Sequence, residues 1–398
     1  MQLNSPALFV EINDSNYIFV AGIHDDNQNL KILEKKTIPI AEVNESKFIN
    51  IDEKKNLIKT NVELIEKKLN YIFKEVIIII DNFNCLSVNI SGFKKLNGSQ
   101  ILKENISYIL NSLKLSITDN EPHKTILHIF NSKSVLDGIN VENLPIGLFG
   151  DFYNHELTFF LIGNNDLKNI KQLFNKSNLS VKKVVLKSFI EGVQLINQNN
   201  VETFFKIKIN KETSSIAFFD QSSFRYSESF NFGTKIIFKD ISKICSIDNE
   251  TISNFLSNCI NINEKFNDND FLEEKYFIST RYRKIRKKLI LDIVNARIEE
   301  IANIILNKNI NTRSFKKTNV TVYFIIQDEL ISNNFKENFK SFFSKNTNSN
   351  PNLIIDFDID SLFINTDKVS TYGWKTEAIP IIQTKNSLIT KIFNSIFG

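Results

Sequence analysis

The sequence predicts an α/β fold made of two similar lobes. Its first part reads as a hairpin, a further strand, a helix and a buried strand, and a second run that opens on a similar hairpin begins near residue 203. This alternation of short apolar strands with helix-length amphipathic segments is typical of α/β domains. With 398 residues, 42% of them hydrophobic and 24% charged, the chain is long enough for more than one globular domain.

The first half opens on a hairpin, because residues 7–12 and 16–22 are strand-like runs on either side of a polar turn. Apolar residues at helical spacing predict a helix over 53–73, and the apolar run Val76–Ile80 has the length of a buried strand. The other elements predicted here are strands at 30–39, 86–90, 125–136, 156–162 and 181–187 and helices at 99–113, 166–176 and 188–197.

The second half opens on a hairpin of strands 204–209 and 215–219. Residues 366–385, which include Gly373 and Pro380, read as a linker. The other elements predicted in this half are helices at 234–245, 250–258, 281–307 and 332–344 and strands at 320–326 and 353–357.

Composition and charge exclude several classes of protein. The net charge of +4 is small for this length and does not indicate a nucleic-acid partner. No apolar run reaches 18 residues, so no membrane-spanning helix is expected, and the first residues lack the pattern of a signal peptide. The three cysteines are widely spaced and form no metal or redox motif, which fits a reducing cytoplasm.

The last twelve residues form the most distinctive segment. At about 100° per residue, its apolar side chains fill one half of a helical wheel and its polar side chains the other. Such a helix is typical of segments that lie in the plane of a membrane surface, and docking on the protein's own core is the alternative. The residues predicted to contact the membrane are Leu388, Ile389, Lys391, Ile392, Phe393, Ile396 and Phe397.

Three segments together resemble one bacterial family. The first runs from Thr125-Ile-Leu-His-Ile-Phe130 to Leu144-Pro-Ile-Gly-Leu-Phe-Gly150 and includes Leu136-Asp-Gly138. The second is Val294-Asn-Ala-Arg-Ile-Glu-Glu-Ile301, and the third is the amphipathic tail. In this combination and order they resemble the FtsA family of cell-division proteins, which belongs to the actin/Hsp70 superfamily.

The resemblance implies an actin-like fold of two ribonuclease H-like lobes, with ATP and Mg²⁺ between them. It also implies a protein on the cytoplasmic face of the inner membrane at the division site. The implied partners are the FtsZ C-terminal peptide, later division proteins, an anionic membrane surface and further copies of the chain in filaments. The domains would be a first lobe at 1–82 and 161–200, an inserted SHS2-type subdomain at 83–160 that binds the later division proteins, a second lobe at 201–365, a linker at 366–385 and a membrane-targeting helix at 386–398.

The positions that match the family's nucleotide loops depart from its pattern. The first phosphate loop reads Glu11-Ile-Asn-Asp-Ser-Asn16, without the expected glycine, and Asp14 would repel a phosphate group. Lys208–Ser215 has lost three glycines and two acidic residues of the second loop, and Ile326–Glu329 has lost the glycines of the adenosine loop. The residues that match the two phosphate loops are Asn13, Asp14, Ser15, Thr213 and Ser214.

These departures predict weak or absent ATP binding, no catalytic residues and no metal site. A direct contact of Lys208 or Lys211 with phosphate is left open as an alternative. The histidines, including His128 in the central motif, are interpreted as structural because none has a carboxylate at a fixed spacing.

A dense basic run lies at 281–288. Either it forms the solvated first turns of a helix, or it binds a partner such as the acidic FtsZ peptide, which the family binds in its second lobe. The candidate partner-binding residues are Arg281, Arg283, Lys284 and Arg286.

The function predicted from the sequence is therefore attachment of FtsZ filaments to the inner membrane and recruitment of later division proteins, without enzymatic activity. One alternative is a polymerising, ATP-binding actin-like ATPase of the division machinery. A second is an actin-like platform protein of pilus or secretion assembly.

Overall fold

A computed structural model describes residues 5–378, apart from 14–15, 26–28, 40–50, 82–84, 259–265, 316–319, 348–350 and 355–356. The chain divides into two compact units. The first contains residues 1–202, 219–227 and 357–398, and the second contains residues 203–218 and 228–356.

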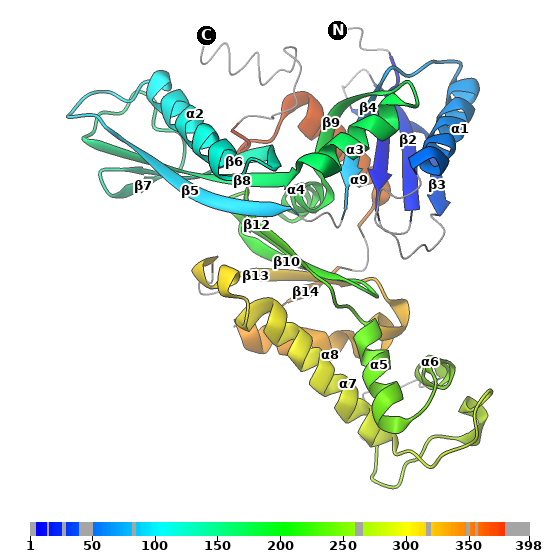
Figure 1. Cartoon of the computed structure of the whole chain (residues 1–398). Helices are drawn as coiled ribbons and strands as arrows, with labels where there is room; N and C mark the ends of the chain where they lie inside the picture. Colours follow the sequence, from blue (N-terminus) through cyan, green and yellow to red (C-terminus); the bar gives the residue numbers. More distant parts are fainter. Residues whose placement is uncertain are drawn as a thin grey trace. The chain divides into compact units, whose positions relative to one another are not determined.

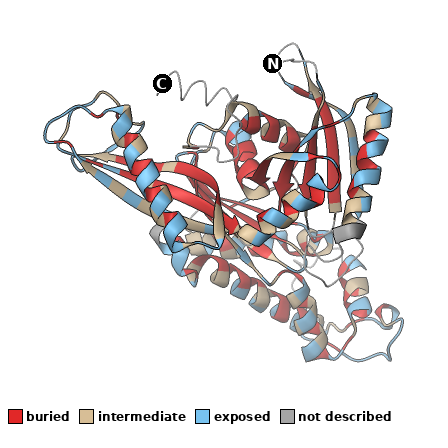
Figure 2. Cartoon of the chain, turned by 45° about the horizontal axis from the view of Figure 1, so that its top comes forward, coloured by how far each residue is buried: buried red, intermediate tan, exposed pale blue. Residues whose placement is uncertain are grey.

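The main sheet of the first unit has the order β3-β2-β1-β4-β9 over the described residues. β1 runs antiparallel to β2 and parallel to β4, and β4 is parallel to β9. The predicted opening hairpin and buried strand are confirmed, and nearly every residue of β1 and β4 is buried (Figure 2). The strands are β1 (Ala7–Ile12), β2 (Asn16–His24), β3 (Leu30–Pro39), β4 (Glu75–Ile80) and β9 (Ser180–Leu186).

Four helices accompany this sheet in the described part of the first unit (Figure 1). α1 (Ile51–Leu69) contacts α3 (Asn164–Asn175), and α4 (Lys187–Asn199) contacts α9 (Ile359–Tyr372). The ring of Phe363 in α9 meets Phe9 of β1 edge to face, with ring centroids 6.2 Å apart.

α9 differs from the linker expected at 366–385. Its N-terminus is capped by Asp358, whose carboxylate accepts hydrogen bonds from the Asp360 and Ser361 N–H groups, and Gly373 ends it at a φ of 78°. Because α9 packs on the sheet of the first unit, residues 357–365 belong with the first unit and not with the second lobe expected at 201–365.

A second sheet of the first unit, with the order β5-β8-β6-β7, lies within residues 86–163. α2 (Lys103–Asn120) lies along this sheet, and its apolar side buries Ile106, Ile109 and Leu113 (Figure 1). This sheet, called the inserted sheet below, consists of β5 (Leu86–Lys95), β6 (Lys124–Leu136), β7 (Ile139–Val141) and β8 (Phe152–Gly163).

The sheet of the second unit has the order β12-β11-β10-β13-β14, and β13 runs parallel to both β10 and β14. It repeats the topology of the first sheet, a hairpin followed by two parallel strands, which confirms the predicted duplication. The turn end of the β11–β12 hairpin, residues 219–227, belongs to the first unit. The strands are β10 (Phe204–Ile209), β11 (Ser214–Asp220), β12 (Ser223–Phe230), β13 (Thr321–Ile326) and β14 (Asn352–Leu353).

The helices of the second unit pack on one another and on β13. They are α5 (Lys235–Cys245), α6 (Asn249–Asn258), α7 (Lys287–Ala302) and α8 (Glu329–Thr347). A π-helical segment, Asn303–Asn307, follows α7, and short 3-10 helices lie at Glu274–Tyr276 and Ile310–Phe315. The helix predicted at 281–307 begins only at Lys287, because the preceding residues pair with another segment. Leu272 donates its N–H to the Ile285 carbonyl oxygen (2.8 Å), and Phe271 and Arg286 form an isolated bridge.

Candidate functional site

The described residues at the two ends of the first predicted phosphate loop contact one another. The Asn13 amide donates to Glu11 Oε1 (3.0 Å), and its oxygen accepts the Asn16 N–H (2.7 Å). Asn13 thus joins the end of β1 to the start of β2. Asp14 and Ser15 lie outside the described residues.

A lysine ammonium group lies at the same edge of the first sheet. Lys187 Nζ is 2.7 Å from Glu11 Oε1 and 3.7 Å from Asp81 Oδ2. Glu11 is fully buried, and the Lys187 side chain is 14% exposed. Burial opposes the charge on Lys187, but the nearby carboxylates Asp81, Glu11 and Glu191 outweigh burial and raise its pKa above the ordinary value.

Lys187 was not predicted, although the sequence contains a signal for it. Asp81 follows β4, Lys187 follows β9 and Glu11 is near the end of β1. These three strands are parallel neighbours, so their C-terminal ends meet at one edge of the sheet. The cation at this edge is bound by the chain's own carboxylates.

The second predicted phosphate loop is also engaged with its own chain. The Asn210 N–H donates to the Thr213 carbonyl oxygen (2.8 Å), and the Asn210 amide donates to Thr213 Oγ1 (3.2 Å). Ser214 Oγ donates to the carbonyl oxygen of Phe232 (2.8 Å). Lys208 is buried on β10. Thr213 and Ser214 therefore have structural partners within the second unit.

The start of α5 binds the carbonyl groups of this loop. The Thr234 and Lys235 N–H groups donate to the carbonyl oxygens of Asn210 and Lys211, each at 2.9 Å. N–H groups at a helix start commonly bind anions, but here protein carbonyl groups use them. Gly233 makes this approach possible, because a Cβ atom at this position would lie 2.2 Å from the Asn210 carbonyl oxygen.

The position that matches the adenosine loop is the start of a helix. Asp328 Oδ2 accepts a hydrogen bond from Thr234 Oγ1 (2.7 Å), and the Asp328 carbonyl oxygen accepts the Ser332 N–H (2.8 Å). The Gln327 N–H donates to the carbonyl oxygen of Ile209 (2.9 Å). Asp328 thus joins the starts of α5 and α8. The sequence contains a signal for this role, because aspartate is a preferred residue at the start of a helix.

The four predicted partner-binding residues, Arg281, Arg283, Lys284 and Arg286, are exposed on the second unit. They precede α7 and do not form its first turns. Lys284 Nζ lies 4.4 Å from the centre of the Phe271 ring. The next two residues of the run are paired locally, Lys287 with Glu273 (3.5 Å) and Lys288 with Asp268 (2.9 Å).

The predicted membrane residues, Leu388 to Phe397, lie outside the described residues. Among the helices that the structure describes, none combines the length and apolar character needed to cross a bilayer. In the same part of the chain, no cluster of three or more His, Cys, Asp or Glu side chains is arranged to hold a metal ion.

No protein-family model and no curated protein sequence matches the chain. Among solved structures, the PilM–PilN type IV pilus biogenesis complex is similar over 91% of this chain and 95% of the other, with 11% identity and a TM-score of 0.52. The chain has the actin-like two-lobe fold.

Two further structures give lower scores. MreB5 of Spiroplasma citri bound to ADP is 10% identical over 92% of this chain and 95% of the other, with a TM-score of 0.43. EutJ from Carboxydothermus hydrogenoformans is 9% identical over 91% and 88%, with a TM-score of 0.41. At 11% identity, the likeness to the PilM–PilN structure shows the fold alone.

Proposed function

We propose that the protein is an adaptor of actin-like fold that attaches FtsZ filaments to the inner membrane and recruits later division proteins without a nucleotide cycle. One observation supports the absence of a nucleotide cycle: described residues of both segments that match the family's phosphate loops are bound by other groups of the chain. Lys187 is bound by Glu11 and Asp81, and the start of α5 is bound by the carbonyl groups of Asn210 and Lys211.

A phosphate group that bound Lys187 or the N–H groups at the start of α5 would have to displace these contacts. Removing one partner of a buried ion pair costs about 3–5 kcal/mol, and each buried hydrogen bond left unmade costs about 1–3 kcal/mol. The site gives little in return, because the glycines that let backbone N–H groups approach a phosphate are missing from 11–16 and 208–215. The free energy therefore favours the contacts within the chain over contacts with a phosphate group.

Isothermal titration of the full chain with ATP and Mg²⁺ tests this part of the proposal. We expect no saturable heat up to millimolar ATP and no rise in melting temperature, since a ligand at 100 times its Kd would stabilise the fold by about 2.7 kcal/mol. A dissociation constant in the low micromolar range would show that the loops are not closed to nucleotide.

The partner-binding part rests on the exposed cations of residues 281–286. Four cations within six residues attract an acidic peptide, and Tyr282, which is 45% exposed, offers it an apolar contact. An exposed cluster of this kind acts mainly on the association rate and is weakened by salt.

Arg281→Glu with Arg283→Glu is expected to weaken binding of the FtsZ C-terminal peptide at least tenfold at low salt, which corresponds to about 1.4 kcal/mol. Fluorescence anisotropy of a labelled peptide measures it. Lys239→Glu with Lys243→Glu is the matched control, because these exposed lysines of α5 give the same change of net charge in the same unit. Equal losses in the two double variants would contradict a local peptide site.

The second candidate is a platform protein of pilus assembly. The likeness to the PilM–PilN structure over 91% of this chain and 95% of the other favours it. Parallel pull-downs with the FtsZ C-terminal peptide and with a PilN-type protein separate the two candidates, because each predicts capture by one bait and not the other.

A further inference from the structure

The segment that leads into the C-terminal tail is paired with the inserted sheet. Residues 374–378 follow α9, and Phe130 of β6 and Glu377 form an antiparallel bridge. On either side of it, the Asn131 N–H donates to the Thr376 carbonyl oxygen (2.7 Å) and the Ala378 N–H donates to that of Ile129 (2.8 Å). Residues 374–378, called the tail root below, thus form a short extra strand beside β6.

Glu377 fixes this extra strand through a fully buried carboxylate. Its Oε1 lies 2.8 Å from His128 Nδ1, and its Oε2 lies 3.9 Å from Lys183 Nζ. Lys183 also donates to the carbonyl oxygen of Val369 in α9 (3.3 Å). Burial alone would raise the pKa of Glu377, but Lys183 and His128 outweigh burial and hold that pKa below its ordinary value.

The same segment also holds the turn of the β11–β12 hairpin. The Trp374 indole N–H and the Thr376 hydroxyl both donate to the Ser222 carbonyl oxygen, at 2.8 and 3.1 Å. Gln221 and Ser222 have positive φ values of 50° and 64°, which is unfavourable for residues other than glycine. Such a turn persists when its surroundings fix it, and here the tail root provides two of the fixing contacts.

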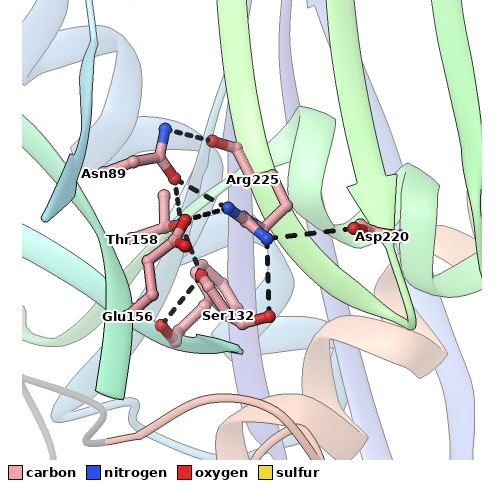
Figure 3. A network of polar contacts seen from close by, with 7 residues as sticks. Asn89, Ser132, Glu156, Thr158, Asp220 and Arg225 are labelled. Carbon is pink, nitrogen blue, oxygen red and sulfur yellow. Dashed lines mark hydrogen bonds and ion pairs between the residues drawn. The ribbon is translucent and has the colours of Figure 1, made fainter. Parts of the chain in front are cut away.

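The hairpin tip, residues 219–227, is fixed in turn to the inserted sheet through Arg225 (Figure 3). The guanidinium group donates to Glu156, to Asn89 Oδ1 (3.4 Å) and to the Ser132 carbonyl oxygen (3.4 Å). The ring of Phe224 stacks on Phe160 of β8, with centroids 4.1 Å apart. Polar and aromatic contacts therefore hold the tip on the same sheet that binds the tail root.

We propose that residues 374–378 and the hairpin tip form a two-way latch on the inserted sheet. Displacing the tail root removes two hydrogen bonds that hold the strained turn, so the tip loosens. Displacing the tip from the inserted sheet removes the acceptor of Trp374 and Thr376, so the tail root loosens. The latch therefore couples displacement of the tail root to displacement of the hairpin tip from the inserted sheet. This coupling does not depend on which partner the protein binds.

Trp374 is the only tryptophan of the chain and reports directly on the latch. We expect Arg225→Ala to increase acrylamide quenching of Trp374 in the full chain, and to speed tryptic cleavage after the exposed Lys375 at least threefold, which lies within the usual range for coupled contacts. If Arg225→Ala does not fold, Thr158→Val is the milder variant. Its hydroxyl contacts Asn89 and Ser132, each at 2.6 Å, within the same network.

Arg297→Ala is the matched control, since Arg297 pairs with Asp240 and Glu300 within the second unit. In the reverse direction, Thr376→Val should speed hydrogen exchange of residues 219–227, because coupling between two sites is reciprocal. Unchanged quenching and cleavage in both network variants, or the same increase in Arg297→Ala, would overturn the latch.

Discussion

Replacing Ile392 and Phe393 with aspartate is expected to abolish binding of the full chain to vesicles that contain phosphatidylglycerol. Both residues fall in the apolar half of the predicted terminal helix. Full burial of an Ile or Phe side chain contributes about 1.5–3 kcal/mol, and each added negative charge near an anionic surface costs about 1 kcal/mol. The summed loss of at least 5 kcal/mol corresponds to a more than 10³-fold weaker affinity.

The matched control places the same charges on the opposite face. Thr390→Asp with Asn394→Asp changes the net charge equally but leaves the apolar half intact. Vesicle sedimentation should show only the electrostatic loss of about 2 kcal/mol for this pair. Equal losses of vesicle affinity in the two double variants would mean that charge, and not insertion of apolar side chains, governs binding. Vesicle binding that survives deletion of residues 386–398 would show that the membrane contact lies elsewhere.

The main sheets were predictable because their strands carry a strong local signal. Val76–Ile80 is a continuous apolar run, and a run of this length is typical of a strand buried on both faces of a sheet. α9 was missed because several of its buried residues are polar. Thr366 and Asp367 resemble loop residues until Asp367 is seen 2.9 Å from His24 in β2 and Thr366 donates to the Leu362 carbonyl oxygen. The partner of Asp367 lies in β2, far away in the sequence, so no local pattern indicates it.

The contacts made by the residues that match the phosphate loops were only partly predictable. The loss of glycine from 11–16 and 208–215 is visible in the sequence, and it indicates what the loops lack. The groups that contact these segments come from distant positions, Lys187 for the first and Gly233 to Lys235 for the second. Lys187 follows from strand order, whereas the approach of Gly233 depends on packing distances that no sequence pattern encodes.

His155→Leu is expected to raise the free energy of unfolding of the first unit and to reduce the amount by which it falls in acid. His155 is 1% exposed on β8, between Tyr153 and Leu157 on the side of the strand that faces the core beneath α2. Neither ring nitrogen has a hydrogen-bond partner. Removing an unpaired buried polar side chain in favour of an apolar one of similar size should stabilise the unit by about 1–2 kcal/mol at pH 7.

The pH dependence follows from the protonation of the same ring. Burial lowers the pKa of His155 from 6.5 to about 4. Between these values the unfolded chain takes up a proton that the folded chain does not, so the free energy of unfolding falls as the pH falls. The free energy of unfolding falls by about 3 kcal/mol between the unfolded-state and folded-state pKa values, and by about 2 kcal/mol from pH 7 to pH 5. His155→Leu removes this component and leaves any contribution of His128 in place.

Urea unfolding followed by Trp374 fluorescence at pH 7 and pH 5 measures both effects, because Trp374 lies in the first unit. The exposed His123 provides the control, and His123→Leu should stay within about 0.5 kcal/mol of the unsubstituted chain at both pH values. If His155→Leu loses as much stability between pH 7 and pH 5 as the unsubstituted chain, the acid sensitivity of this unit does not arise at His155. The buried pair of His128 and Glu377 would then be the next origin to test, because its histidine also has a pKa lowered by burial.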